Sequence, residues 1–386
     1  MLLRVGASGL RGQVGNGLAP GNAVRYAASL GTYLEGGLVA IGMDSRYSSP
    51  MLRHAVLAAL LSSGCEVLDC GMVPAPVLQF TVRRLQLAGG LLIGATHHPA
   101  GWNALVPIQA RGAVFSQVQA QSLLDIYHSQ QFRRCQYDRI GKVTPAPTDM
   151  EDAYLTGLAR HLDVAAIQRA KFTVVADFCS GTGGRLVKAL ADRLGVTLVG
   201  INERPHGFLP HDPEPRPRSS AQVQALIAPL KAHAGFVFNS DLTRVALVSN
   251  TGETLSEEYS FPLVARHLLP RLPGPKVVVT NLCSTRTLDD VVKAAGGIVD
   301  KARTGQTFIV DRMQDLHAAI GGEGSGSMAL GTFLPAYDAC LMMGLTLEAM
   351  AQTGHTLAGL MASLPRYHIV KRKITVKGGR AYGLIH

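Results

Sequence analysis

The stretch of sequence that decides the fold reads GATHHPAGWNALV from Gly94 to Val106. It follows an apolar run at 91–93, which predicts a buried strand. The hydroxyl of Thr96 and two imidazoles therefore come at the end of a strand, where the sites of α/β proteins form. This position suits catalysis. The alternative interpretation is an ordinary strand-to-helix turn in which Thr96 is the capping residue.

The composition is that of a globular protein. The chain has 386 residues, of which 47% are hydrophobic, so it can supply cores for two or three domains. No uninterrupted apolar run reaches the roughly 18 residues of a membrane span, and the first residues lead directly into a strand-like segment and a glycine turn. We expect a cytoplasmic protein without membrane contact.

The cysteines and the net charge limit which metal sites, disulfides and ligands can be expected. The six cysteines are scattered without a C-x-x-C pair, so we expect buried free thiols and neither a zinc site nor disulfides. The formal charge of +10 suits an anionic partner but does not identify it. Aromatic residues make up 6% of the chain and do not interleave with a basic stripe, so we do not expect nucleic acid as a ligand.

Strand-like and helical segments alternate through most of the chain, which predicts an α/β fold with mixed, largely parallel sheets. Three units can be separated, at 1–150, 151–256 and 257–368, and they are candidates for copies of one design. A Thr/Pro-rich stretch at 144–148 reads as the linker that ends the first unit, and the glycine-rich 321–327 reads as a loop. A basic stub, 369–386, follows the third unit.

Motifs in each unit resemble those of the α-D-phosphohexomutases, the phosphoglucomutase and phosphomannomutase superfamily. The stretch from Gly94 is similar to T-A-S-H-N-P-x-x-x-N-G-x-K, the family's phosphoserine loop. The other matches are GASGLRG at 6–12 to G-T-S-G-I-R-G, DSR at 44–46 with SP at 49–50 to D-T-R-x-S-S-P, FNSDLTR at 238–244 to D-G-D-x-D-R, and GGEGSG at 321–326 to G-G-E-x-S-G-H. The resemblance implies three tandem α/β/α domains around a central cleft, without the family's fourth domain.

The resemblance also implies roles for single residues. Thr96 takes the place of the phosphoserine and His97 that of the neighbouring histidine. Arg11 and Arg244 would orient phosphate, while Glu323 and Ser325 would hold sugar hydroxyls. The family's magnesium loop corresponds to three residues, Asn239, Asp241 and Thr243.

At several positions this sequence differs from the family's motifs in ways that affect the expected function. One carboxylate remains where the family has three, so we expect any Mg²⁺ site to be weakened. A softer metal held by His97, His98 and Asp241 is an alternative. Val106 replaces the family's lysine, and Ser327 and Gln306 replace two histidines, which removes groups suited to general acid–base catalysis.

We therefore interpret the chain as a divergent phosphohexomutase that binds a phosphosugar or related anion with mutase activity weakened or lost, in a regulatory or scaffolding role. The alternative is an active mutase with Thr96 as phosphocarrier. Two further alternatives stay open. Arg11, Arg244 and Glu323 could pair with each other as a structural relic. The basic stub could contact an anionic ligand or an acidic protein, or be a solvated tail.

Overall fold

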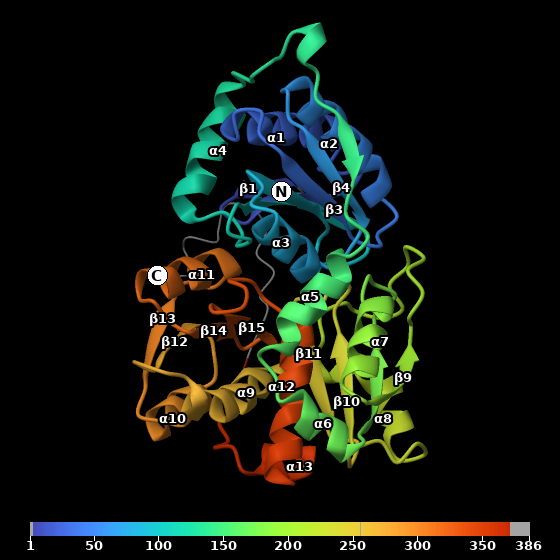
Figure 1. The fold of residues 1–386 in the computed structure, drawn as a ribbon, viewed down its shortest axis with the longest axis vertical. Helices are drawn as coiled ribbons and strands as arrows, with labels where there is room; N and C mark the ends of the chain where they lie inside the picture. Colours follow the sequence, from blue (N-terminus) through green and yellow to red (C-terminus); the bar gives the residue numbers. More distant parts are fainter. Residues whose placement is uncertain (1–2, 255, 371–386) are drawn as a thin grey trace.

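The structure is a computed structural model that describes residues 3–254 and 256–370. Three α/β units surround a common centre (Figure 1), with the first at the top, the second at the lower right and the third at the lower left. The basic stub falls almost entirely on 371–386, so the predicted contact with an anion or an acidic partner lies outside the described residues.

The first unit is built on a seven-stranded mixed sheet in the order β1-β2-β6-β5-β3-β4-β7. Its strands are β1 (Leu3–Gly6), β2 (Gly9–Gln13), β3 (Val39–Met43), β4 (Val67–Met72), β5 (Gly89–Ile93), β6 (Trp102–Gln109) and β7 (Val143–Pro145). Its helices are α1 (Pro20–Tyr33), α2 (Ser49–Ser62), α3 (Ala75–Arg84) and α4 (Gln117–Ser129). Helix α3 lies on the side of the sheet that faces the other two units (Figure 1).

The second and third units each carry a four-stranded sheet, in the orders β11-β10-β8-β9 and β13-β12-β14-β15. The second contains α5 (Met150–Ala159), α6 (Val164–Ala170), β8 (Thr173–Asp177), α7 (Gly184–Arg193), β9 (Thr197–Ile201), α8 (Ala221–Ile227), β10 (Ala234–Phe238) and β11 (Val245–Ser249). The third contains α9 (Ser260–Leu268), β12 (Val277–Asn281), α10 (Thr287–Ala294), β13 (Ile298–Ala302), α11 (Gln306–Asp315), β14 (Ile320–Glu323), β15 (Ser327–Leu330), α12 (Ala339–Thr353) and α13 (Leu357–Ala362).

All three units share one topology. In each, the first three core strands are parallel and the fourth is antiparallel to the third, so the spatial order is fourth, third, first, second. Strands β5 and β10 are buried along their whole length, as expected for strands covered on both faces. The predicted fold of three α/β/α units with mixed, largely parallel sheets is confirmed. The carboxyl ends of β5, β10 and β14 carry the candidate site residues other than Arg11, which lies on β2.

Three local expectations are wrong. The loop after β5 leads into strand β6 and not into a helix, so Thr96 does not cap a strand-to-helix turn. Part of the expected linker forms the edge strand β7, which pairs in parallel with β4. The glycine-rich 321–327 is largely a hairpin between β14 and β15 and not an open loop.

Packing joins the units into one body. A single apolar cluster contains buried side chains from all three, among them Val82, Leu190 and Leu345. Glu348 of α12 adds a polar link: it accepts hydrogen bonds from His267, from Arg271 and from the backbone N–H of Asp163, which begins α6 in the second unit. The second and third units are therefore held together by both apolar and ionic contacts.

Two composition-based expectations can be compared with the structure. Cys65, Cys70, Cys179 and Cys340 are buried as expected, but Cys135 is partly accessible and Cys283 is exposed, so the expectation of six buried thiols is wrong in part. Among the described helices, none combines the length and the apolar character that a bilayer crossing requires.

Candidate active site

A cavity of about 330 Å³ lies where the three units meet. The first unit supplies Arg11, Thr96 and His97, the second Thr243 and Arg244, and the third Glu323. The other lining residues are Ala7, Ser8, Val106, Pro107, Val114, Thr304, Gly305, Gln306, Thr307 and Tyr337. The structure therefore brings most of the predicted site residues together, although they are up to 312 positions apart in the sequence, from 11 to 323.

The loop that carries Thr96 is held by the buried side chain of Arg46. Its guanidinium donates to the Asp44 carboxylate at 2.9 Å and to four backbone carbonyls of the loop region, those of Thr96, His98, Pro99 and Trp102, at 2.7–3.1 Å. Both Arg46 and Asp44 have fully buried side chains. Because the guanidinium is planar and rigid, these bonds fix the loop backbone in one conformation.

Thr96 occupies a conformation that β-branched residues rarely adopt. Its φ is 46°, in the left-handed region. Its hydroxyl lies 2.8 Å from Nδ1 of His97, and its carbonyl accepts a hydrogen bond from Ser240 of the second unit. Strain of this kind persists only where surrounding contacts impose it. The loop is therefore built to present the Thr96 hydroxyl at a fixed position beside an imidazole.

The two histidines of the loop are neutral at physiological pH. Burial and the positive charge of Arg244 lower the pKa of His97 to about 2, with smaller contributions from His98 and Arg11. Burial and Arg11 likewise lower the pKa of His98 to about 4. A neutral His97 can accept the hydrogen bond of the Thr96 hydroxyl at Nδ1.

The cavity concentrates positive charge. Arg11 makes no ion pair with any described residue, and burial together with Arg4 and Arg244 lowers its pKa. Arg244 donates to Glu214 at 3.3 Å. The side-chain nitrogen of Gln306 is buried without a partner among the described residues. An anion in this cavity would therefore meet guanidinium groups and an amide donor that is otherwise unsatisfied.

The alternative that Arg11, Arg244 and Glu323 pair with each other is wrong. Glu323 accepts hydrogen bonds from the Asn281 side chain at 2.7 Å and from the Gly305 backbone N–H at 2.8 Å. Neither arginine reaches it within hydrogen-bond distance. Glu323 therefore stands in the cavity wall held by two neutral donors, which leaves its carboxylate suited to accept from a ligand hydroxyl.

Ser325 does not line the cavity. Its hydroxyl bonds to that of Ser327 at 2.9 Å, within the turn of the β14–β15 hairpin. That turn closes against the second unit: Gly326, at φ +74°, accepts from the Val245 N–H at 3.0 Å, and a Cβ there would lie 2.2 Å from the Val245 carbonyl oxygen. The hairpin thus brings Glu323 into the same cavity as Arg244.

The residues of the predicted magnesium loop bind one another. The amide nitrogen of Asn239 donates to Asp241 at 2.7 Å and to the Thr243 hydroxyl at 2.9 Å, while the Thr243 hydroxyl donates to Asp241 at 2.7 Å. Burial, with Asp44 nearby, raises the pKa of Asp241. One oxygen of Asp241 is buried without a partner among the described residues.

This donor set does not fit Mg²⁺. The cation prefers several carboxylate or water oxygens, whereas this loop offers one carboxylate with an amide N–H group directed at it. Across the described part of the chain, no three His, Cys, Asp or Glu side chains gather as a metal site would require. His97, His98 and Asp241 therefore do not form the softer-metal site considered as an alternative.

Sequence reasoning missed some of the contacts that build the site. Arg46 entered only as part of a motif, and its bonds to loop carbonyls have no signature in the sequence. Ser240 lies inside a quoted motif, yet its contact with Thr96 joins two units. Gln306 stands where the family has a histidine, but its amide lines the cavity and is itself a candidate ligand contact.

Comparison with known proteins agrees with this architecture. The α/β/α domain models I, II and III of phosphoglucomutase/phosphomannomutase match residues 3–134, 152–252 and 245–367. A probable phosphoglucosamine mutase of Pyrococcus abyssi is 31% identical over 369 residues, which are 96% of this chain and 80% of the relative. A phosphoglucomutase/phosphomannomutase of Thermococcus kodakarensis is 28% identical over 381 residues, 97% of this chain and 83% of the relative.

A solved structure of similar fold extends the agreement. A protein of Thermus thermophilus assigned as a phosphomannomutase superposes with a TM-score of 0.85 at 26% identity, over 94% of this chain and 83% of that one. Three α/β/α units around a cleft that is lined from all three define the architecture of a phosphohexomutase. The chain belongs to the phosphoglucomutase/phosphomannomutase family.

Proposed function

We propose that the central cavity binds a phosphorylated hexose and that the protein is an intramolecular phosphotransferase of the phosphohexomutase type, with Thr96 as phosphoryl carrier. One observation carries the proposal: the Thr96 hydroxyl, bonded to a neutral His97, stands in the same cavity as Arg11, which has no ion-pair partner among the described residues. The relatives, which are named as mutases of phosphorylated hexoses, support the reaction class.

In the proposed reaction a hydroxyl oxygen of the sugar attacks the phosphorus of phospho-Thr96. A new O–P bond forms at the sugar, the bond between phosphorus and Thr96 Oγ1 breaks, and the hydroxyl proton of the sugar ends on Oγ1. His97 is placed to pass that proton, since its Nδ1 lies 2.8 Å from Oγ1. Arg11 and Arg244 would hold the non-bridging phosphate oxygens, and Glu323 a sugar hydroxyl.

A phosphate group in the cavity is needed to make His97 a working base. In the free cavity, burial and the positive charge of Arg244, Arg11 and neighbouring groups lower the pKa of His97 to about 2. A phosphate dianion between the arginines would neutralise their field and raise that pKa. The phosphoryl group on Thr96 would itself supply this charge, so His97 would regain basicity in the phosphorylated protein.

A second candidate function is binding of the phosphosugar without turnover, in a regulatory or scaffolding role. The observation that favours it is the hydrogen-bonded set of Asn239, Asp241 and Thr243, which leaves one carboxylate in the metal loop. Val106, in the cavity wall, adds no acid–base group. The names of the relatives favour turnover, so we place this function second.

The experiment is phosphoryl transfer to the protein from glucose 1,6-bisphosphate, followed by intact mass and peptide mapping, with mutase assays on the 1-phosphates of glucose, mannose and glucosamine. We expect one added phosphoryl group on Thr96, lost in Thr96→Val and retained in the matched Thr304→Val variant, which alters another threonine of the cavity wall. Calorimetric binding without labelling or turnover would support the second function, especially if a Thr96→Ser, Val106→Lys variant gained activity.

A further inference from the structure

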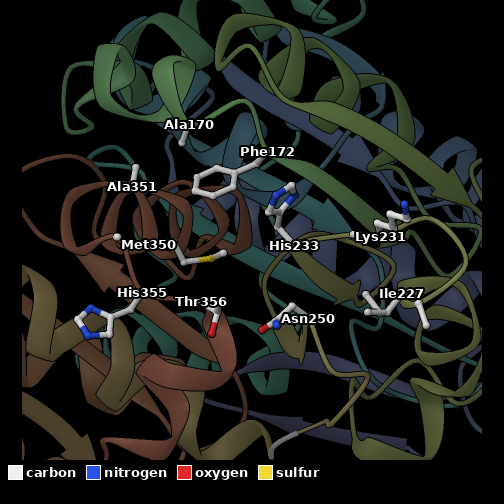
Figure 2. Close-up of a pocket in the computed structure, with 13 residues that line it drawn as sticks. Ala170, Phe172, Ile227, Lys231, His233, Asn250, Met350, Ala351, His355 and Thr356 are labelled. Atoms are coloured by element: carbon white, nitrogen blue, oxygen red, sulfur yellow. The ribbon is translucent and has the colours of Figure 1, made fainter.

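A second cavity lies away from the candidate active site, between the second and third units. Figure 2 shows it between the start of the second unit's central strands and the end of helix α12. Its volume is about 490 Å³, within the range of small-molecule sites. It is lined by Ala170, Phe172, Ile227, Ala228, Lys231, Ala232, His233, Asn250, Met350, Ala351, Gly354, His355 and Thr356.

One part of this cavity is apolar. Phe172, Ile227 and Met350 contribute buried side chains, and four alanines keep the space between them open. Figure 2 shows the Phe172 ring and the Met350 side chain on neighbouring walls. The Phe172 ring also contacts the edge of the His233 imidazole, with centroids 5.5 Å apart. A flat apolar group can therefore pack against an aromatic ring and a thioether.

Three of the polar groups around it, on Lys231, His233 and Asn250, are donors, whereas the neutral ring of His355 has its proton on Nδ1, which faces the Thr353 carbonyl at 3.1 Å. Nδ1 of His233 accepts the Thr173 N–H at 3.0 Å, so the proton of the neutral ring is at Nε2. The side-chain oxygen of Asn250 accepts the Ala358 N–H, which leaves the amide N–H group for a ligand. Lys231 makes no ion pair or hydrogen bond through its ammonium with any described residue. No Asp or Glu is among the lining residues.

The second cavity is separated from the first by rigid elements that run between them. Strand β11 starts directly after Arg244 of the active-site cavity and ends directly before Asn250, a span of roughly 16 Å at the rise of a strand. Helix α12 starts just after Tyr337 of the active-site cavity and contains Met350 near its other end. The two cavities are therefore distinct sites at opposite ends of shared elements.

We propose that this second cavity is a binding site for an aromatic carboxylate. Its ring packs between Phe172 and Met350, and its carboxylate accepts hydrogen bonds from Asn250 and His233 and faces the ammonium of Lys231. The charge selectivity follows from a wall that has cationic and neutral donors and no acidic group. The site does not depend on the function proposed for the central cavity.

The test compares 2-naphthoate with its neutral isostere 2-naphthamide by isothermal titration calorimetry on the full chain. We expect the carboxylate to bind about tenfold more tightly than the amide, as a hydrogen-bonded charge would give. Lys231→Gln should weaken the carboxylate about three- to fivefold, because this lysine is exposed and screened by water. Lys188→Gln, which removes an exposed lysine of α7 outside the cavity, should leave binding unchanged.

Competition locates the site independently of any variant. Saturating glucose 1-phosphate should not displace 2-naphthoate, since the two cavities do not share a lining residue. Equal affinity for acid and amide, displacement by the sugar phosphate, or equal effects of Lys231→Gln and Lys188→Gln would each overturn the proposal. Because the first two comparisons use the unmodified protein, the result does not depend on the folding of a variant.

Discussion

Substitution of Arg46 by lysine is expected to release the loop that carries Thr96. The guanidinium makes five hydrogen bonds, one to Asp44 and four to backbone carbonyls, at a position that is fully buried. An ammonium group has three donors, so at least two buried acceptors would lose their partner. At about 1.5–3 kcal/mol for each bond to a charged donor, we expect a loss of about 3–6 kcal/mol in stability.

The assay uses a reporter that the chain already contains. Trp102 is the only tryptophan, it ends the loop, and its backbone carbonyl is one of the groups that Arg46 holds. In Arg46→Lys we expect the Trp102 emission to shift to the red under native conditions. In urea its fluorescence transition should precede the loss of helical circular dichroism. Arg185→Lys, in an ion pair whose arginine is 80% exposed, is the matched control and should change stability by less than about 0.5 kcal/mol.

Two results would refute the reasoning. If Arg46→Lys unfolds at the same urea concentration as the unmodified protein, the five bonds do not stabilise the fold. If it is destabilised but its Trp102 emission is unchanged and both probes report one transition, then Arg46 stabilises the first unit as a whole. In that case it would have no particular effect on the loop, and Thr96 would be positioned by other contacts such as that of Ser240.

Three further predictions concern buried ionisable groups. Glu348→Gln should lower the stability by about 2–4 kcal/mol in urea unfolding, because it removes the buried carboxylate that pairs with Arg271 and accepts from His267. The pKa of His97 is about 2 in the folded chain, so below about pH 6.5 the unfolded chain binds the extra proton, and stability falls as the pH drops from there. His97→Asn should reduce the slope of stability against pH below about pH 6.5 by up to about 1.4 kcal/mol per pH unit. An unchanged slope would contradict the lowered pKa of His97. Burial disfavours the charged form of His211, but its bond to the Asp177 carboxylate outweighs this effect and raises the pKa of His211 to about 11. The stability that this ion pair contributes is complete below about pH 6.5 and is lost as the pH rises towards 11. His211→Asn should therefore reduce the fall of the melting temperature with pH in the alkaline range.

The sequence was sufficient for the three-unit fold because the central strands are short apolar runs followed by polar motifs. Strands β5 and β10 are examples, since each is buried on both faces and ends at a candidate site. The failures fall where tertiary pairing decides the structure. Strand β7 ends in Pro145, which reads as a linker residue but is tolerated at a sheet edge. The β14–β15 hairpin has a composition typical of loops, yet it is fixed by pairing with β12 and by contact with the second unit.

In the candidate active site, too, some features could be predicted from the sequence and others could not. Thr96, His97, Arg11 and Arg244 could be assigned to one site because their motifs resemble those of the family, and the structure places all four in one cavity. Their hydrogen-bond partners could not be predicted. The Arg46 guanidinium binds mainly backbone carbonyls, which every residue has, and the Ser325 hydroxyl bonds to Ser327 and does not line the cavity.

The balance between transfer and simple binding depends on how the buried charges compensate one another. In the free protein the cavity holds an arginine without an ion-pair partner among the described residues and a neutral His97. Asp241, whose pKa is raised by burial, does not line the cavity but accepts a hydrogen bond from Thr243, which does. A bound phosphate would satisfy the arginine and return basicity to His97, which assists transfer. A phosphate that approached Thr243 would also meet the field of the Asp241 carboxylate bonded to that residue, without a cation to offset it, and this repulsion opposes transfer. If Asp241 takes up a proton as the phosphosugar binds, that repulsion disappears, and the raised pKa of Asp241 makes this uptake easier. The cavity could then accept a phosphate dianion by gaining protons where other members of the family would use a metal.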